Sequence, residues 1–164
     1  MPILVKNKHT LLIDEFKFRC CIGKKSTTIN KKEGDKKTPK GTFEIENLYF
    51  RKDRIKKPET SLKCIEIKKN MGWCDDIYQP KKYNKLVQIN KNLKCERLKR
   101  KDYKYDLLIP IKYNFKKPVI GKGSCIFIHL TRDYKPTAGC IALKEKDFLI
   151  MLKLINKKTK IKIY

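Results

Sequence analysis

Short runs of alternating apolar and polar residues dominate the chain and predict β-strands. An alternation with a period of two places one face of a strand against a core and the other face in solvent. Residues 23–42 are instead predicted to form a polar loop with a turn at Thr38-Pro39-Lys40-Gly41, and residues 68–100 show no regular period. Strands are predicted at 3–5, 10–13, 16–22, 43–50, 62–67, 105–113, 119–120, 125–130, 139–143 and 159–163.

One helix is predicted, over residues 144–156. Apolar residues on most sides of the segment between Phe148 and Ile155 indicate that this helix is well buried. Because strands far outnumber helices, the fold class is expected to be mostly β or α+β, with one C-terminal helix. Neither a repeat nor a linker divides the chain, which favours a single domain over residues 1–164.

The chain has 42 lysines and arginines against 17 acidic residues, a formal charge of +25. Such an excess attracts polyanions. Only six of the basic residues are arginine, however, and neither a concentrated patch nor a reading helix appears, so no specific nucleic-acid binding is expected. The N-terminus lacks the apolar stretch of a secretory signal, and no apolar run approaches the ~20 residues that span a bilayer. The sequence alone therefore predicts a soluble chain.

Cysteine usage limits the metal and redox chemistry. The chain has seven cysteines, no C-x-x-C pair and only two histidines, so neither a zinc site nor another cofactor is expected. The odd number of cysteines favours reduced thiols with one reactive member.

His129 and Cys140 are the strongest candidates for chemistry. An apolar run ends in His129, and Gly139-Cys140 opens the next one, so two joined strands would set an imidazole beside a thiol. The amides of Gly139 and Cys140 would then form an oxyanion hole. Arg132, Lys135 and the general positive field are expected to favour the thiolate.

The segments around this pair resemble the catalytic core of the L,D-transpeptidase (YkuD-domain) family, in particular its branch with Thr137-Ala138-Gly139-Cys140. The resemblance lies in 121–130 and 136–143, together with three segments upstream: 32–43, Gly72-Trp73-Cys74-Asp75-Asp76 with Tyr83-Asn84, and Tyr105-Asp106-Leu107 leading to Tyr113-Asn114.

The resemblance implies a two-sheet β domain and a cysteine acyltransferase of cell-wall synthesis and cell shape. Its partners would be peptidoglycan stem peptides or muropeptides. By position, Cys140 would be the nucleophile and His129 the proton donor and acceptor, with the Leu130 carbonyl orienting the imidazole. A thioester would form as D-alanine leaves, and the acyl group would pass to an amine. Two alternatives stay open: an L,D-carboxypeptidase-type hydrolase, and a basic polyanion-binding module with a silent site.

The substrate contacts implied by the resemblance are less defined. Ala138 and Ala142 stand where commoner members carry histidine and arginine, so the contact with the substrate carboxylate is expected from elsewhere, with Arg132 and Lys135 as candidates. The implied location is the periplasm or cell envelope, although without a visible signal a cytoplasmic location stays open, and a monomer is expected. The candidate substrate-binding residues are Arg132, Thr137, Trp73, Asp76 and Tyr113.

Overall fold

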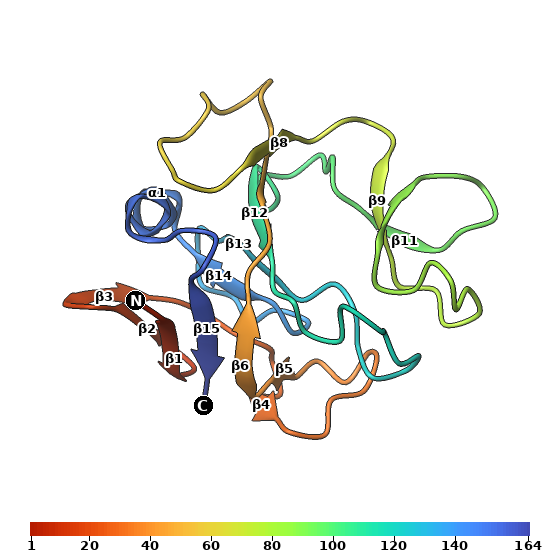
Figure 1. Ribbon diagram of the computed structural model, residues 1–164, viewed down its shortest axis with the longest axis horizontal. Helices are drawn as coiled ribbons and strands as arrows, with labels where there is room; N and C mark the ends of the chain where they lie inside the picture. The colour runs from red at the N-terminus through yellow and green to blue at the C-terminus, as the bar shows by residue number, and fades with distance from the viewer.

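The computed structural model describes residues 1–164, and two five-stranded sheets form its framework (Figure 1). The first sheet has the order β3-β2-β1-β15-β6. Its N-terminal meander is antiparallel, whereas β15 from the C-terminus enters parallel to β1 and antiparallel to β6. The two chain ends thus share one sheet. Its strands are β1 (Ile3–Asn7), β2 (Thr10–Ile13), β3 (Phe16–Arg19), β6 (Gly41–Glu44) and β15 (Lys160–Ile163).

The second sheet has the order β14-β13-β12-β7-β8. β12 runs antiparallel to both β7 and β13, while β14 lies parallel to β13 at one edge of the sheet. All residues of β12, β13 and β14 are buried, so these strands lie inside the molecule. The strands are β7 (Leu48–Phe50), β8 (Cys64–Glu66), β12 (Leu107–Pro110), β13 (Phe127–Leu130) and β14 (Ile141–Leu143).

The single helix, α1 (Glu145–Leu154), follows directly after β14. Its buried residues Phe148, Met151 and Leu152 recur at the three- and four-residue spacing of one helix face. They join a core of 25 buried residues that draws on both large sheets. In Figure 1 the helix lies between the β3 end of the first sheet and the loop that leads to β8. No helix has the length and apolar character needed to cross a membrane.

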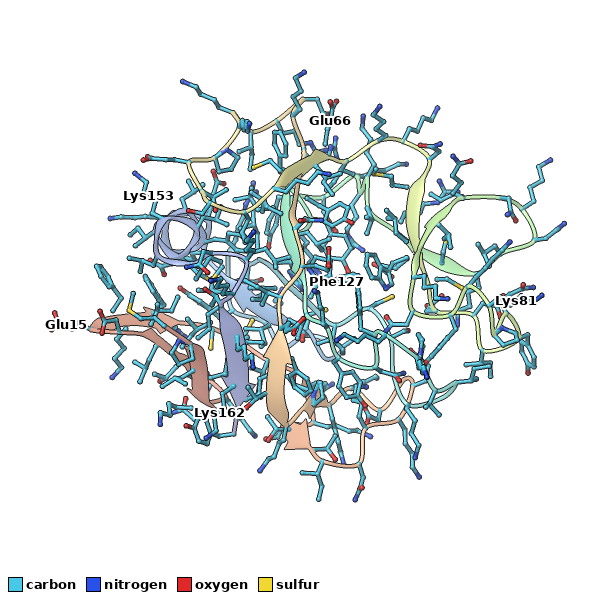
Figure 2. The ribbon with its side chains drawn as sticks, in the orientation of Figure 1. Glu15, Glu66, Lys81, Phe127, Lys153 and Lys162 are labelled. Atoms are coloured by element: carbon cyan, nitrogen blue, oxygen red, sulfur yellow. The ribbon has the colours of Figure 1, made fainter.

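A three-stranded sheet of order β10-β9-β11 lies on the far side of the second sheet from α1 (Figure 1). A second, smaller buried cluster, which includes Trp73 and Phe127, connects it to the second sheet. Figure 2 shows Phe127 among the side chains at the centre of the molecule, whereas the labelled lysines point outward. The strands of the three-stranded sheet are β9 (Met71–Cys74), β10 (Leu86–Gln88) and β11 (Cys95–Arg97). A further two-stranded sheet pairs β4 (Thr27–Thr28) with β5 (Thr38–Pro39).

The predicted fold class is confirmed: the chain is mostly strands, with one helix near the C-terminus. Three local predictions are wrong, and the aperiodic region 68–100, for which no element was predicted, contains β9, β10 and β11. The predicted polar loop 23–42 contains β4, β5 and the start of β6. The predicted strand 43–50 is two strands, β6 and β7. Residues 119–120 form no strand, because the Asn114 side chain bonds the Val119 main chain and holds an exposed loop.

Candidate active site

Adjacent parallel strands bring His129 and Cys140 to one face of the second sheet. His129 of β13 lies opposite Ala142 of β14, and Cys140 precedes Ala142 by two residues. Because side chains alternate between faces, Cys140, Ala142 and His129 point to the same side. A bond from the main chain to the thiol agrees with this placement: the Phe127 N–H, two residues before His129, donates to Cys140 Sγ at 3.4 Å.

Both side chains line one cavity of about 530 Å³. They are themselves almost buried, with 9% of Cys140 and 7% of His129 exposed. The cavity wall carries charges of both signs, which lie on segments that are distant in sequence: the carboxylates Glu33, Asp75, Glu96 and Asp133, and the cations Lys31, Arg100, Lys104 and Lys135.

The His129 ring is held on two sides. Its Nδ1 lies 2.9 Å from the Leu130 carbonyl oxygen. A carbonyl only accepts, so Nδ1 carries the proton and Nε2 is the basic nitrogen. The Tyr105 ring packs against the imidazole at a centroid distance of 5.4 Å, and its hydroxyl donates to Glu96 at 3.1 Å. Burial, with help from Lys104, lowers the pKa of His129 to about 4, so the imidazole is neutral at pH 7.

Cys140 is a thiol in the free protein. Its Sγ–H donates to the Cys125 carbonyl oxygen at 3.1 Å. Burial raises the pKa of the Cys140 thiol to about 12; the Phe127 N–H opposes this shift, and Glu96 adds to it. The expectation that the positive field favours the thiolate is therefore wrong for the free protein, because desolvation outweighs charges that act through solvent. Lys31 is the cation that lowers this pKa.

The amide of the nucleophile itself is free in this turn. The Gly139 N–H donates to Thr137 Oγ1 at 3.1 Å, and the Thr137 hydroxyl donates to the Cys140 carbonyl at 2.6 Å. The Gly139 amide, predicted for an oxyanion hole, is therefore already occupied. The Cys140 N–H makes no hydrogen bond within the chain, which leaves it as the donor available to a ligand beside Sγ.

Of the candidate substrate-binding residues, Thr137 lines the cavity and Arg132 does not. Arg132 is exposed, and its guanidinium stacks on the Tyr103 ring at 4.1 Å. Lys135, the other candidate for a carboxylate contact, does line the cavity, but 85% of its side chain is exposed and it pairs with Asp133 at 3.3 Å.

The remaining three candidates also lie outside the cavity lining. Trp73 is buried, and its Nε1–H donates to Asn84 Oδ1 at 2.9 Å, so it fixes a core contact. Asp76 accepts two main-chain N–H groups: that of Tyr78 closes its own loop, and that of Lys94 ties this loop to a second one. The Tyr113 hydroxyl donates to the Lys122 carbonyl at 2.6 Å. The structure therefore does not bring Trp73, Asp76 or Tyr113 into the site.

Several residues that line the cavity are not among the candidates taken from the sequence. Glu96 and Arg100, paired at 2.8 Å, come from the aperiodic region, where no pattern marked them. Asp75 lay in a family-like segment; its Oδ1 is buried without a partner, and burial raises its pKa. Tyr105 belongs to the family-like segment Tyr105-Asp106-Leu107. The resemblance therefore singled out its position, although not its contact with His129. No three His, Cys, Asp or Glu side chains are grouped so as to hold a metal ion.

A family model described as the L,D-transpeptidase catalytic domain, YkuD, matches residues 3–163. The chain belongs to the YkuD family. Among solved structures, this YkuD domain is similar to Bd1075 of Bdellovibrio bacteriovorus, with 16% identity and a TM-score of 0.46. The similarity covers 99% of this chain and 47% of Bd1075, so the chain spans about half the length of that protein. A comparison with curated proteins returned no match.

Proposed function

We propose that the protein is a cysteine-dependent L,D-transpeptidase of the Thr-Ala-Gly-Cys branch, acting on peptidoglycan stem peptides in the cell envelope. One observation carries the proposal: Cys140 and His129 share a face of adjacent parallel strands and line one cavity, with the His129 Nδ1 bonded to the Leu130 carbonyl. This arrangement supplies a nucleophile and an oriented base. Membership of the YkuD family supports the reaction class.

In the proposed acylation, the Cys140 proton passes to His129 Nε2 as Sγ attacks the carbonyl carbon of the bond to D-alanine. The carbonyl π electrons move to oxygen, and the Cys140 N–H donates to this oxyanion. The protonated imidazole then gives its proton to the leaving amine. The C–N bond breaks, D-alanine departs, and the acyl group remains on Sγ as a thioester.

Deacylation uses the same groups in reverse. An acceptor amine attacks the thioester and loses a proton to His129 Nε2. The C–S bond then breaks, and the imidazolium returns a proton to Cys140. General acid–base transfer of this kind contributes roughly 10²–10⁴-fold. The imidazole is neutral at rest, because burial lowers its pKa to about 4, so Nε2 is free to accept a proton at the start of each half-reaction.

The cavity charges suit a substrate that carries both an ammonium and a carboxylate. Glu33 and Asp75 lie on its wall for the ammonium. For the carboxylate we assign Lys104, which lines the cavity without an ion pair to any carboxylate of the chain. Its main-chain carbonyl accepts the Leu130 N–H at 2.9 Å, which ties it beside the His129 strand. Lys104 would thus replace the arginine that commoner members carry where this chain has Ala142.

Intact mass measurement tests the proposal. The wild-type protein is incubated with tetrapeptide muropeptides and, separately, with a carbapenem-type β-lactam, and we expect one covalent adduct that Cys140→Ala abolishes. Cys64→Ala is the matched control, because Cys64 is half-buried and outside the cavity, and it should retain the adduct. An adduct on Cys140→Ala would remove the assignment.

Product analysis with and without an acceptor amine separates transfer from hydrolysis. Release of D-alanine without a cross-linked product in the presence of the amine would identify an L,D-carboxypeptidase instead. Polyanion binding that falls steeply with salt, together with no adduct on any variant, would identify a binding module with a silent site.

A further inference from the structure

Thr38 is a buried polar residue that bonds the peptide joining Gly139 to the nucleophile. Its side chain is fully buried, with 0% exposed. Its Oγ1–H donates to the Gly139 carbonyl at 2.8 Å, across 101 positions of sequence, and Oγ1 accepts the Gly23 N–H at 2.9 Å. Both hydrogen-bonding functions of this hydroxyl are therefore engaged, one of them on the residue before Cys140.

Because the peptide bond is planar, the hydrogen bond to the Gly139 carbonyl also sets the direction of the Cys140 N–H. In a trans peptide the C=O of one residue and the N–H of the next point in opposite directions. The Gly139 carbonyl points toward Thr38, which does not line the cavity. The Cys140 N–H, which is unpaired, therefore points away from Thr38, and Cys140 itself lines the cavity.

The segment that carries Thr38 is itself firmly placed. The Thr38 N–H donates to the carbonyl of Ser26, the residue before β4, at 2.9 Å, and Thr38 itself pairs with Thr27 of β4. The neighbouring main chain packs against the nucleophile turn so closely that a Cβ on Gly139 would lie 2.9 Å from the Lys37 carbonyl oxygen. The hydroxyl thus acts from a rigid support, with backbone atoms in contact on both sides.

We propose that Thr38 is a positioning residue that pre-orients the Cys140 amide as the oxyanion donor. The inference rests on the proposed function, because an oxyanion forms only if Cys140 is acylated. A donor that is aimed before the substrate arrives needs no reorganisation in the transition state, which is where oxyanion-hole stabilisation comes from. The hydroxyl acts through the Gly139 carbonyl and does not touch the substrate.

Thr38→Val tests this assignment, because it keeps the shape of the side chain and removes the hydroxyl. The Gly139 carbonyl and the Gly23 N–H lose their partner, and the peptide is free to tilt. We expect the rate constant of acylation by the β-lactam to fall roughly 10- to 100-fold, less than the roughly 10²–10³-fold for outright removal of an oxyanion donor. Non-covalent affinity should be unchanged. Thr38→Ser, which keeps the hydroxyl, should restore the rate to within about threefold of wild type.

Two controls separate positioning from a general structural role. Thr159→Val removes another buried hydroxyl, which accepts the Asn156 N–H at 2.9 Å outside the cavity lining, and should leave acylation unchanged. Alkylation of Cys140 by iodoacetamide at pH 9 is displacement at a saturated carbon and forms no oxyanion. Thr38→Val should therefore keep the wild-type alkylation rate while it loses acylation.

Each outcome of this experiment decides the inference. Slow acylation with normal alkylation in Thr38→Val, restored by serine, supports it. Wild-type acylation in Thr38→Val overturns the role of Thr38 and leaves the proposed function intact, and parallel loss of acylation and alkylation also overturns it, because Cys140 itself is then displaced. Absence of acylation in the wild-type protein overturns the proposed function and the role of Thr38 together.

Discussion

Alkylation of Cys140 in the free protein should be slow and should rise with pH throughout the neutral range. The thiol donates to a main-chain carbonyl, and burial raises its pKa from the ordinary 9.0 to about 12. The neighbouring His129, with its pKa lowered to about 4, does not take the proton at rest. The resting pair is therefore thiol and neutral imidazole, and iodoacetamide reacts with the small thiolate fraction only.

The size of the effect follows from the raised pKa. A pKa higher by three reduces the thiolate fraction roughly 1000-fold at pH 7. A more basic thiolate is also more nucleophilic, with a Brønsted coefficient of about 0.4–0.5, which recovers a factor of roughly 15–30. Alkylation of Cys140 should therefore be at least about 30- to 60-fold slower than that of an unperturbed thiol, and its limited exposure slows it further.

Residue-resolved mass spectrometry measures this rate among the seven cysteines. The protein is pulsed with iodoacetamide from pH 5 to 10, quenched and digested, and the Cys140 peptide is quantified. The same peptide in urea-unfolded protein is the reference. The logarithm of the native rate should rise by about one for each pH unit across this range. A plateau between pH 5 and 8, at rates above the unfolded reference, would mean a preformed thiolate–imidazolium pair and would refute the resting state deduced from burial.

Three further outcomes follow from single contacts. In wild type, stability should rise between pH 4 and 6.5, because the unfolded histidine binds a proton in this range and the folded one, with its pKa of about 4, does not; His129→Gln should remove about 3 kcal/mol of this pH dependence of the unfolding free energy. Urea titrations of both proteins across this window measure the effect, and an equal pH dependence in the two proteins would contradict it. Gly139→Ala should destabilise the fold by about 1–3 kcal/mol and slow acylation, because Gly139 has a φ of +148° and the added Cβ would lie 2.9 Å from the Lys37 carbonyl oxygen. Urea unfolding and the rate of adduct formation measure the two effects, and wild-type values of both would show that alanine is tolerated there without strain. Phe148→Ala should cost about 3–5 kcal/mol by opening a core cavity, against less than about 0.5 for Ile29→Ala, since Phe148 is 0% and Ile29 81% exposed; thermal or urea melts compare them, and similar losses would place Phe148 outside the core.

Sequence pattern predicted strands of two kinds: those whose two faces differ in burial, and the apolar runs of β12, β13 and β14, which are buried throughout. β2 alternates between half-buried and buried positions and β15 between exposed and buried positions, because one face of each packs on the core. The helix prediction, 144–156, also holds within two residues of α1, whose end is set by the extended conformation of Ile155. In both cases the pattern is a direct record of which side the core is on.

The strands that the pattern missed lack that record. β9 has three buried residues in succession, while its neighbours β10 and β11 have three residues each and none buried. Strands this short hold too little alternation to be told from loop, and their pairing is fixed by contacts with a sheet elsewhere in the chain. The same region supplies Glu96 and Arg100 to the cavity, so the missed strands and the missed cavity residues have one cause.

The candidate site divides along the same line. The order of His129, Gly139 and Cys140 along two apolar runs was enough to predict an imidazole and a thiol on neighbouring strands, because strand pairing is a local consequence of that pattern. The protonation of the pair was not predictable, since it depends on how completely distant segments remove water from it. The orientation of the Cys140 amide was equally hidden, because its partner through Gly139 is Thr38, 101 positions from Gly139 in sequence.

Burial also decides what the net charge of +25 can do at this site. Charges on lysines at the surface act through water and are screened within about 8–10 Å at physiological ionic strength, whereas desolvation acts on the thiol itself. The pKa of Cys140 therefore rises although the chain is strongly basic. In the proposed reaction, Sγ loses its proton only as it attacks the substrate carbonyl. The negative charge then develops on the carbonyl oxygen, which lies beside the Cys140 amide. The fold would then keep the nucleophile unreactive until an acyl donor occupies the cavity. Thr38 would determine how well the Cys140 N–H is oriented to stabilise the oxyanion that forms.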